Sequence, residues 1–249
     1  MGSQGLAKKG LPMVAGMMLI ASFLLGHSPA YGGGTLVETF TNNTYDQNLW
    51  FIGTQGQGPS TAVANNRLEI SIPANASSGG NPWPFGGFIN SKNFLAGDFD
   101  VQVDFSLVTW TVPAGIQMGI MPVFPRGSGR FTAGVDLMSD PDFNPSQFYG
   151  DYTSVSIPTL DTAGKLRLKR TGTTIEAFYW APSGWQPIGG PRTDAQFWRD
   201  CSISFYVLSH NFQSKDVKVA FDNLQIIYSR ITSGYNYRAV GALLPLLLQ

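Results

Sequence analysis

A run of short acidic and amide side chains in the middle of the chain has the spacing of a metal-binding loop. Asp140, Asp142 and Asn144 follow at intervals of two residues, and Asp151 lies eleven residues after Asp140. Oxygen ligands at such intervals can converge on a hard cation, and an EF-hand places its bidentate acid where Asp151 stands. Calcium is therefore the candidate cofactor. The alternative is a solvated turn, because Pro145 replaces the glycine of an EF-hand loop and no helical pattern flanks it.

Residues for nucleophilic catalysis or for a histidine metal site are scarce. His27 lies in the N-terminal segment described below, which leaves His210 as the remaining histidine of the sequence. A zinc site would need further His or Cys ligands, and no Gly-x-Ser-x-Gly elbow offers a serine nucleophile. Cys201, the single cysteine, opens an apolar strand-like run and is expected to be a buried small hydrophobe. We expect His210 to hydrogen-bond a neighbouring loop.

Several tryptophans have the surroundings that carbohydrate recognition requires. Trp83 lies in a proline-stiffened loop, Trp110 ends a long alternating segment, and Trp185 follows a Pro-Ser-Gly turn. Exposed aromatic rings stack on the apolar faces of sugars, while nearby amides and carboxylates bind the hydroxyl groups. Core packing is the alternative for each tryptophan taken singly. We expect at least one of these three to line a surface groove.

The elements that must position these side chains are β-strands. Of the 249 residues, 13% are charged, 13% aromatic and 43% hydrophobic, with 29 glycines and 16 prolines. The glycines and prolines disfavour a helical bundle, and the hydrophobic share disfavours disorder. Basic and acidic residues number 16 each, which leaves no electrostatic footprint for nucleic acid. One all-β domain remains, of a length that single sandwiches commonly have.

Two-residue alternation is the main structural signal from Gly34 onward. In residues 98–110 apolar and polar side chains alternate, as in an antiparallel strand with one buried face. Residues 166–170 and 175–180 flank a Thr-Gly-Thr turn and predict a hairpin. Further strands are expected at 35–40, 60–64, 67–72, 85–91, 116–124, 130–138, 150–157, 201–209 and 216–228, with a helical turn at 194–198. About a dozen strands predict a two-sheet antiparallel β-sandwich, or jelly roll.

The two ends of the chain differ from the middle. Residues 1–30 combine a basic pair, an apolar run at 11–25 and small residues before a cleavage site, which predicts a secretory signal peptide. The expected location is therefore secreted, periplasmic or at the cell surface. A β-sandwich domain is predicted for 31–229 and an apolar C-terminal tail for 230–249. The apolar run in that tail, at 239–248, is too short to span a bilayer, so no stable transmembrane span is expected after signal cleavage.

Several phrases of the sequence occur in the order of a known superfamily. They are YDQNLW at 45–50, NNRLEI at 65–70, GDFDVQVDF at 97–105, LRLKRTG at 166–172 and VAFDNLQI at 219–226. In this order they resemble the concanavalin A-like lectin/glucanase superfamily, whose jelly rolls include laminin-G-type, legume-lectin-type and laminarinase-type domains. The resemblance covers residues 35–229, and the chain looks like bacterial secreted domains of this type without an assigned activity. It implies a jelly roll, and calcium is common in the superfamily.

The resemblance also indicates where catalytic acids would stand. Hydrolases of the superfamily carry Glu-x-Asp-x-x-Glu on one strand, and two carboxylates can act there as nucleophile and acid/base on a glycosidic bond. The local match has Gly134 and Ser139 in place of the two glutamates, Asp136 in the middle, and Asp140 one residue late. The chain therefore lacks the pair that retaining hydrolysis of that type needs.

A binding face is predicted around Asp136 instead. Alternation places Asp136 on the opposite side of its strand from Val135 and Leu137, and a hairpin with the preceding strand would set Gln117 beside it. Trp110, at the end of a long strand expected to adjoin, would stack on a sugar ring held by Asp136 and Gln117. Trp83 and Trp185 would then be further contacts, or the site itself.

These observations predict a secreted, lectin-like β-sandwich that binds a glycan or polysaccharide and catalyses no reaction. Two alternatives stay open. One is a glycoside hydrolase or lyase with acids outside the familiar motif, which two clustered carboxylates on one sheet face would favour. The other is a structural or adhesive cell-surface protein, which a long unpaired edge strand or a docked tail would favour.

Overall fold

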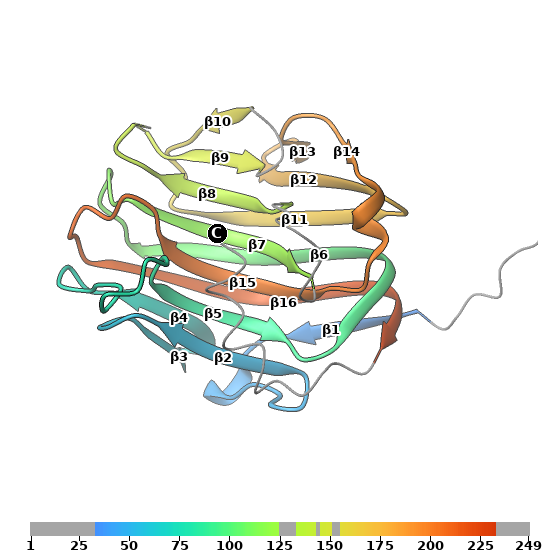
Figure 1. The fold of residues 1–249 in the computed structure, drawn as a ribbon, viewed down its shortest axis with the longest axis horizontal. Helices are drawn as coiled ribbons and strands as arrows, with labels where there is room; N and C mark the ends of the chain where they lie inside the picture. The colour runs from blue at the N-terminus through green and yellow to red at the C-terminus, as the bar shows by residue number, and fades with distance from the viewer. Residues whose placement is uncertain (1–32, 125–132, 143–144, 151–154, 233–249) are drawn as a thin grey trace, which may run out of the picture. The chain divides into compact units, whose positions relative to one another are not determined.

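The computed structural model describes residues 33–124, 133–142, 145–150 and 155–232, which form two antiparallel β-sheets (Figure 1). The nine-stranded sheet has the order β13 (Gly184–Pro187), β12 (Thr174–Ala181), β11 (Ala163–Thr171), β6 (Phe94–Thr109), β16 (Val217–Thr232), β4 (Arg67–Ile72) and β3 (Ser60–Ala64), with β1 (Gly34–Glu38) paired to β16 and β14 (Arg192–Thr193) to β12. The seven-stranded sheet has the order β10 (Ser156–Pro158), β9 (Gln147–Gly150), β8 (Val135–Ser139), β7 (Ile116–Val123), β15 (Ser202–Ser209), β5 (Gly86–Ser91) and β2 (Trp50–Gln55). Two short 3-10 turns, η1 (Thr41–Asn43) and η2 (Ala195–Trp198), complete the described elements.

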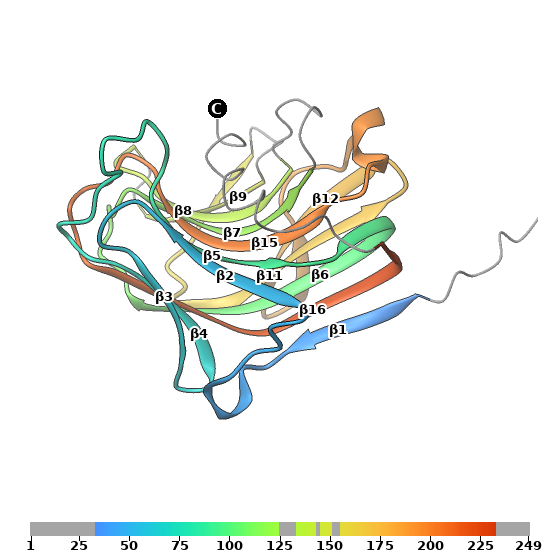
Figure 2. The same ribbon diagram turned by 60° about the horizontal axis from the view of Figure 1, so that its bottom comes forward.

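The two sheets lie face to face, and the hydrophobic core fills the space between them (Figure 2). The central strands contribute alternate side chains to this core, because successive side chains of a strand point to opposite faces. On β6 these are Val101, Val103 and Phe105, and on β15 they are Phe205 and Val207. Each such side chain contributes about 1.5–3 kcal/mol by leaving water. The predicted all-β, two-sheet antiparallel sandwich is confirmed.

Most of the predicted strands are present, and several boundaries were wrong. β6 begins at Phe94 rather than at 98, because Gly97 takes a positive φ of 74° and lets the strand continue through an irregular pairing with β16. The strand expected at 150–157 is two strands, β9 and β10, on either side of that segment. β16 continues to Thr232, so the sandwich extends three residues beyond the predicted limit of 229.

The local signals for turns were accurate. Gly172 bends the predicted β11–β12 hairpin with a φ of 58°. The helical turn expected at 194–198 is η2, and the Asp194 side chain caps it by accepting a hydrogen bond from the Gln196 backbone N–H at 2.9 Å. Cys201 is fully buried, as predicted, and burial raises the pKa of its thiol to about 11.

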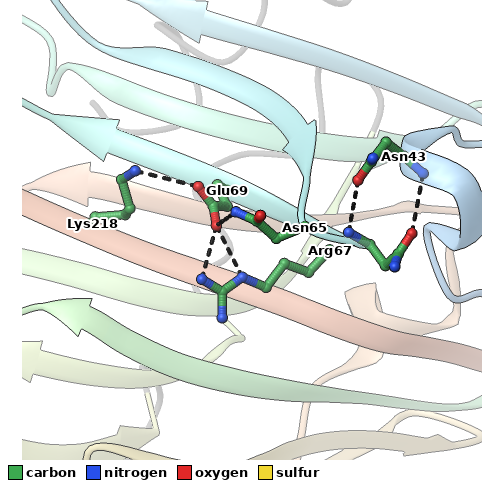
Figure 3. A network of polar contacts seen from close by, with 6 residues as sticks. Asn43, Asn65, Arg67, Glu69 and Lys218 are labelled. Atoms are coloured by element: carbon green, nitrogen blue, oxygen red, sulfur yellow. Dashed lines mark hydrogen bonds and ion pairs between the residues drawn. The ribbon is translucent and has the colours of Figure 1, made fainter.

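A polar network on the nine-stranded sheet fixes the turn between β3 and β4 (Figure 3). The Glu69 carboxylate accepts hydrogen bonds from Asn65 Nδ2 at 3.0 Å and from Arg67 Nη2 at 2.8 Å, and Lys218 Nζ lies 3.3 Å from its second oxygen. Burial raises the pKa of this carboxyl, but the hydrogen bonds from Asn65, Arg67 and Lys218 outweigh that effect. The pKa of Glu69 therefore lies below its ordinary value.

This network predicts a pH-dependent contribution to stability. A carboxyl whose pKa is depressed on folding stabilises the fold above its unfolded pKa, and the contribution is lost as pH falls through the folded pKa. We expect Glu69→Gln to lower the free energy of unfolding by about 1 kcal/mol at pH 7 and by less at pH 3. Urea denaturation of both proteins across this range measures the difference. A gap that is constant with pH would contradict the assignment.

Candidate functional site

The side of the seven-stranded sheet that faces away from the core carries polar and aromatic side chains. On β15, Phe205 and Val207 point into the core, so Tyr206 points away from it. Paired residues of neighbouring strands share a side, which extends this surface across six strands. The outer face, as the term is used below, consists of Gln147, Tyr149, Asp136, Met138, Gln117, Gly119, Met121, Ser204, Tyr206, Leu208, Phe88, Asn90, Phe51, Gly53 and Gln55.

Asp136 lies at the centre of a hydrogen-bonded group on the outer face. Gly119 of β7 pairs with Asp136 on one side and with Tyr206 on the other. Because Gly119 has no side chain, the Tyr206 hydroxyl reaches across β7 and donates a hydrogen bond to Asp136 Oδ1. Gln117 Nε2 donates to Asp136 Oδ2 at 2.8 Å and to the Tyr206 hydroxyl at 3.0 Å. A Cβ at position 119 would collide with Asp136 Oδ1 and with the Val135 carbonyl oxygen, so this geometry requires glycine.

A second glycine also makes room for an aromatic ring of the paired strand. It lies on the apolar part of the outer face. Phe88 of β5 pairs with Gly53 of β2, and a Cβ on Gly53 would lie 2.7 Å from Phe88 Cζ. Phe51 packs beside it, with ring centroids 6.0 Å apart, and Tyr206 and Leu208 join the same buried cluster. Aromatic rings thus form the middle of the outer face, next to the polar group around Asp136.

Four polar atoms of the outer face have no hydrogen-bond partner among the described residues. They are Gln55 Nε2, Asn90 Oδ1, Gln147 Oε1 and Ser204 Oγ. Asn90 and Ser204 are paired across β5 and β15 and are at most 1% exposed. An unsatisfied buried polar atom costs about 1–3 kcal/mol, so most such atoms in folded proteins have partners. All four lie on the same side of one sheet as the hydrogen-bonded group around Asp136.

The structure brings together two of the five predicted ligand-binding residues. Gln117 and Asp136 are hydrogen-bonded on the outer face, as the alternation predicted. The expected neighbour Trp110 is elsewhere, and that prediction was wrong, because the long strand before it, β6, belongs to the other sheet. The Trp110 indole donates from Nε1 to Ser146 Oγ at 3.0 Å and lines a cavity of about 150 Å³ with Leu160.

The other two tryptophans lie in different parts of the fold. Trp83 lies in the loop that leads into β5. Trp185 is on β13 of the nine-stranded sheet, where it meets the Trp180 ring edge-on at 5.2 Å and lies 5.5 Å from the Arg167 guanidinium. Trp185 therefore lies on the other sheet from Gln117 and Asp136, whereas the Trp83 loop leads into a strand of the same sheet.

Sequence reasoning missed several outer-face residues. Tyr206, Ser204 and Asn90 stand in predicted strands whose alternation already separated them from the core residues. The signal was a polar or hydroxyl-bearing side chain at every second position of a run that is otherwise apolar. Gln55 gave no such signal, because β2 was not predicted at all.

In the described part of the predicted calcium loop, both Asp140 carboxylate oxygens face nitrogen atoms of the protein. Asp140 is buried, and its Oδ1 accepts a hydrogen bond from the Asp142 backbone N–H at 2.9 Å. Its Oδ2 accepts from Asn211 Nδ2 and lies near His210 Nε2, both at 3.1 Å, which confirms that His210 contacts a neighbouring loop. No cluster of three or more acidic, His or Cys residues suited to a metal occurs in the described ranges. Asn144 and Asp151 lie outside the described residues.

Calcium therefore stays a prediction from the sequence, and a chelator tests it. Because the Asp140 oxygens already face nitrogen donors, we expect excess chelator to leave the melting temperature unchanged. A ligand bound by the native state alone would stabilise it by mass action. A fall in melting temperature that added calcium reverses would assign the ion to this loop.

Comparisons with known proteins bear on the fold. No protein-family model matches the sequence, and no curated protein sequence matches it. Among solved structures, the CBM2 module of Lactobacillus casei BL23 phage J-1 evolved Dit is similar with a TM-score of 0.53 at 10% identity, covering 82% of this chain and 99% of that one. The Emp47p carbohydrate recognition domain gives 0.51 at 12%, covering 81% and 96%.

A third similar structure is a Bacillus licheniformis β-glucanase, with a TM-score of 0.50 at 12% identity, covering 80% of this chain and 99% of the enzyme.

In the described part of the chain, no helix has the length and apolar character to cross a membrane. The sheet order, the core and these likenesses agree with one another. The chain therefore has a two-sheet jelly-roll fold, which it shares with these carbohydrate-binding and glucanase structures.

Proposed function

We propose that this chain is a carbohydrate-binding domain and that its site is the outer face of the seven-stranded sheet. The observation that carries the proposal is the set of partly exposed amide and aromatic side chains on this one surface, namely Gln55, Gln117, Gln147, Phe51 and Tyr149. Sugars suit such a surface, because their hydroxyl groups hydrogen-bond to amides and their apolar ring faces stack on aromatic side chains. The similar structures, a carbohydrate-binding module, a carbohydrate recognition domain and a glucanase, support a glycan-related role.

Binding without catalysis is the form of this function that the outer face favours. Asp136 is the one carboxylate among the outer-face residues defined above, and it is engaged by Tyr206 and Gln117. Hydrolysis of a glycosidic bond by the usual route needs a second carboxyl group a few ångströms away. Cys201 offers no nucleophile either, because burial keeps its thiol protonated at neutral pH.

Export is the second element of the proposal. The tripartite segment at 1–30, which lies outside the described residues, is the reason to place the domain beyond the cytoplasmic membrane. The secreted material is expected to begin near Tyr31, and mass spectrometry of the intact chain measures this. Cytosolic protein that retains Met1 would contradict export.

A screen of the exported chain on an array of immobilised glycans tests the proposed function. Titration calorimetry with the best soluble hit then compares Gln117→Leu with Gln102→Leu. Gln102 is a matched control because it lies on β6, between the core residues Val101 and Val103, and therefore faces away from the core on the other sheet. We expect at least fivefold weaker binding for the first variant and unchanged binding for the second. Equal loss in both variants, or no binding to any glycan, would refute the proposal.

A further inference from the structure

The middle of the outer face is buried, although it lies on the side of its sheet that faces away from the core. Tyr206 and Asp136 are 0% exposed, and Phe88 and Leu208 are also buried. The hydrophobic cluster around Tyr206 consists of outer-face residues alone, so within the described ranges no other element contributes an apolar side chain to it. Asp136 and Tyr206 each make a further interaction besides the hydrogen bonds described above.

The outward side of the nine-stranded sheet behaves differently. Its large apolar side chains remain accessible, with Val37 53%, Ile227 43% and Trp180 42% exposed. An antiparallel sheet commonly has one face on the core and the other in water, and the nine-stranded sheet follows this rule. The buried aromatic rings on the seven-stranded sheet therefore indicate that a further segment of the chain covers them.

The C-terminal tail, residues 233–249, begins next to this sheet. β16 belongs to the nine-stranded sheet and ends at Thr232, whose hydroxyl donates a hydrogen bond to Asp200 Oδ2 at 3.1 Å. Asp200 lies two residues before β15, the central strand that carries Tyr206 and Leu208. The tail therefore leaves the described chain at the end of the sandwich where β15 enters the seven-stranded sheet.

The length of the tail is sufficient to cross the outer face. An extended chain spans about 3.3 Å per residue, so residues 233–238 reach roughly 20 Å, and the eight residues of β15 extend about 26 Å. The apolar run at 239–248 can therefore lie anywhere along β15. It contains five leucines and no charged residue, which matches the apolar cluster of Phe51, Phe88 and Leu208.

Another segment outside the described residues also borders this sheet, but its composition fits less well. The connection between β7 and β8, at 125–132, contains Arg126, Arg130 and two glycines, with Phe131 as its one large apolar residue. The tail is thus the better source of apolar surface for this face.

We propose that the C-terminal tail docks across the outer face and covers Tyr206, Phe88 and Leu208. A consequence that rests on the proposed function is that the tail competes with the glycan, because both occupy one surface. The apparent affinity of the full chain is then lowered in proportion to the docked fraction. Docking on this face makes the tail a cover for the site rather than an element of assembly.

Oxidation of methionine by hydrogen peroxide tests the docking in residues 31–249. Met138 is on the outer face and 7% exposed, whereas Met118 is in the core and 0% exposed. The double variant Leu243→Asp with Leu247→Asp is expected to oxidise Met138 at least fivefold faster than the parent, measured by mass spectrometry of peptides. Met118 is expected to stay slow, which verifies that the core is intact.

The control variant, Ser233→Asp with Asn236→Asp, adds the same two charges to the polar part of the tail. Its Met138 is expected to oxidise at the parent rate. Equal Met138 rates in the parent and the leucine variant would overturn the docking and assign the cover to another segment, such as 125–132.

Calorimetry with the best soluble glycan tests the competition separately. We expect the leucine variant to bind at least fivefold more tightly than the parent, and the control variant to bind like the parent. Faster Met138 oxidation without any gain in glycan affinity would keep the docking and overturn the outer face as the glycan site. Unchanged oxidation, together with glycan binding that Gln117→Leu weakens, would overturn the docking and leave the proposed function standing.

Discussion

Asp136→Ala is expected to weaken glycan binding at least tenfold while the protein stays folded. The carboxylate accepts hydrogen bonds from the Tyr206 hydroxyl and from Gln117 Nε2, so its removal leaves both groups without the partner that holds them. A tenfold loss corresponds to about 1.4 kcal/mol, which is within the range for one hydrogen bond to a charged group. Calorimetric titration with the best soluble glycan gives the affinity, and circular dichroism verifies the fold.

Trp185→Ala is the control that distinguishes the outer face from the alternative binding site at Trp185 that the sequence predicted. Trp185 lies on β13 of the nine-stranded sheet, beside Trp180. Binding is therefore expected to be unchanged in this variant. If Trp185→Ala loses binding and Asp136→Ala retains it, the site is on the nine-stranded sheet and the outer face is not the binding surface.

Arg170→Met is expected to cause the largest loss of stability, about 3 kcal/mol or more. The Arg170 side chain is 1% exposed, and its guanidinium donates to the carbonyl oxygens of Gly97 at 2.6 Å, Arg199 at 2.7 Å and Phe197 at 2.9 Å. It also lies 4.5 Å from the Phe99 ring. Methionine fills a similar volume but donates nothing, so carbonyl groups from two separate segments lose a buried donor.

Lys169→Met provides the comparison, because Lys169 is the preceding residue on the same strand and its side chain is partly exposed. We expect the Lys169 variant to unfold within about 0.5 kcal/mol of the parent in urea. Equal stability of the Arg170 variant and the parent would show that the guanidinium contacts contribute nothing net, as buried charges replaced by apolar groups sometimes do.

Local patterns were enough to predict the fold class and part of the site. Alternation identified the long strand that became β6, and it placed Asp136 away from Val135 and Leu137. The Gln117–Asp136 contact followed because β7 and β8 are consecutive strands joined as a hairpin. Contacts between neighbours in sequence are the ones that turn positions and two-residue periodicity determine.

The rest of the site depends on pairings that no local pattern reveals. β15 lies between β7 and β5, strands about 90 and 120 residues earlier in the chain, and this order alone brings Tyr206 to Asp136. The same reason explains the error at Trp110, since nothing in residues 98–110 says to which sheet they belong. The sequence contains Gly119 but does not show why a glycine is needed there. The reason is that Gly119 pairs with both Tyr206 and Asp136, and its missing side chain lets these two residues meet.

Methionine methyl groups provide the most direct test of the outer face as the binding surface. Four of the seven methionines lie in residues 1–30, which leaves Met118, Met121 and Met138 in residues 31–249. Met121 and Met138 are on the outer face, whereas Met118 is in the core between the sheets. The three methyl signals of protein carrying ¹³C-labelled methionine are assigned by single Met→Leu variants and followed during titration with the best soluble glycan. The account predicts saturable shifts for Met121 and Met138 with Met118 unmoved; binding that shifts neither outer-face methyl would contradict it.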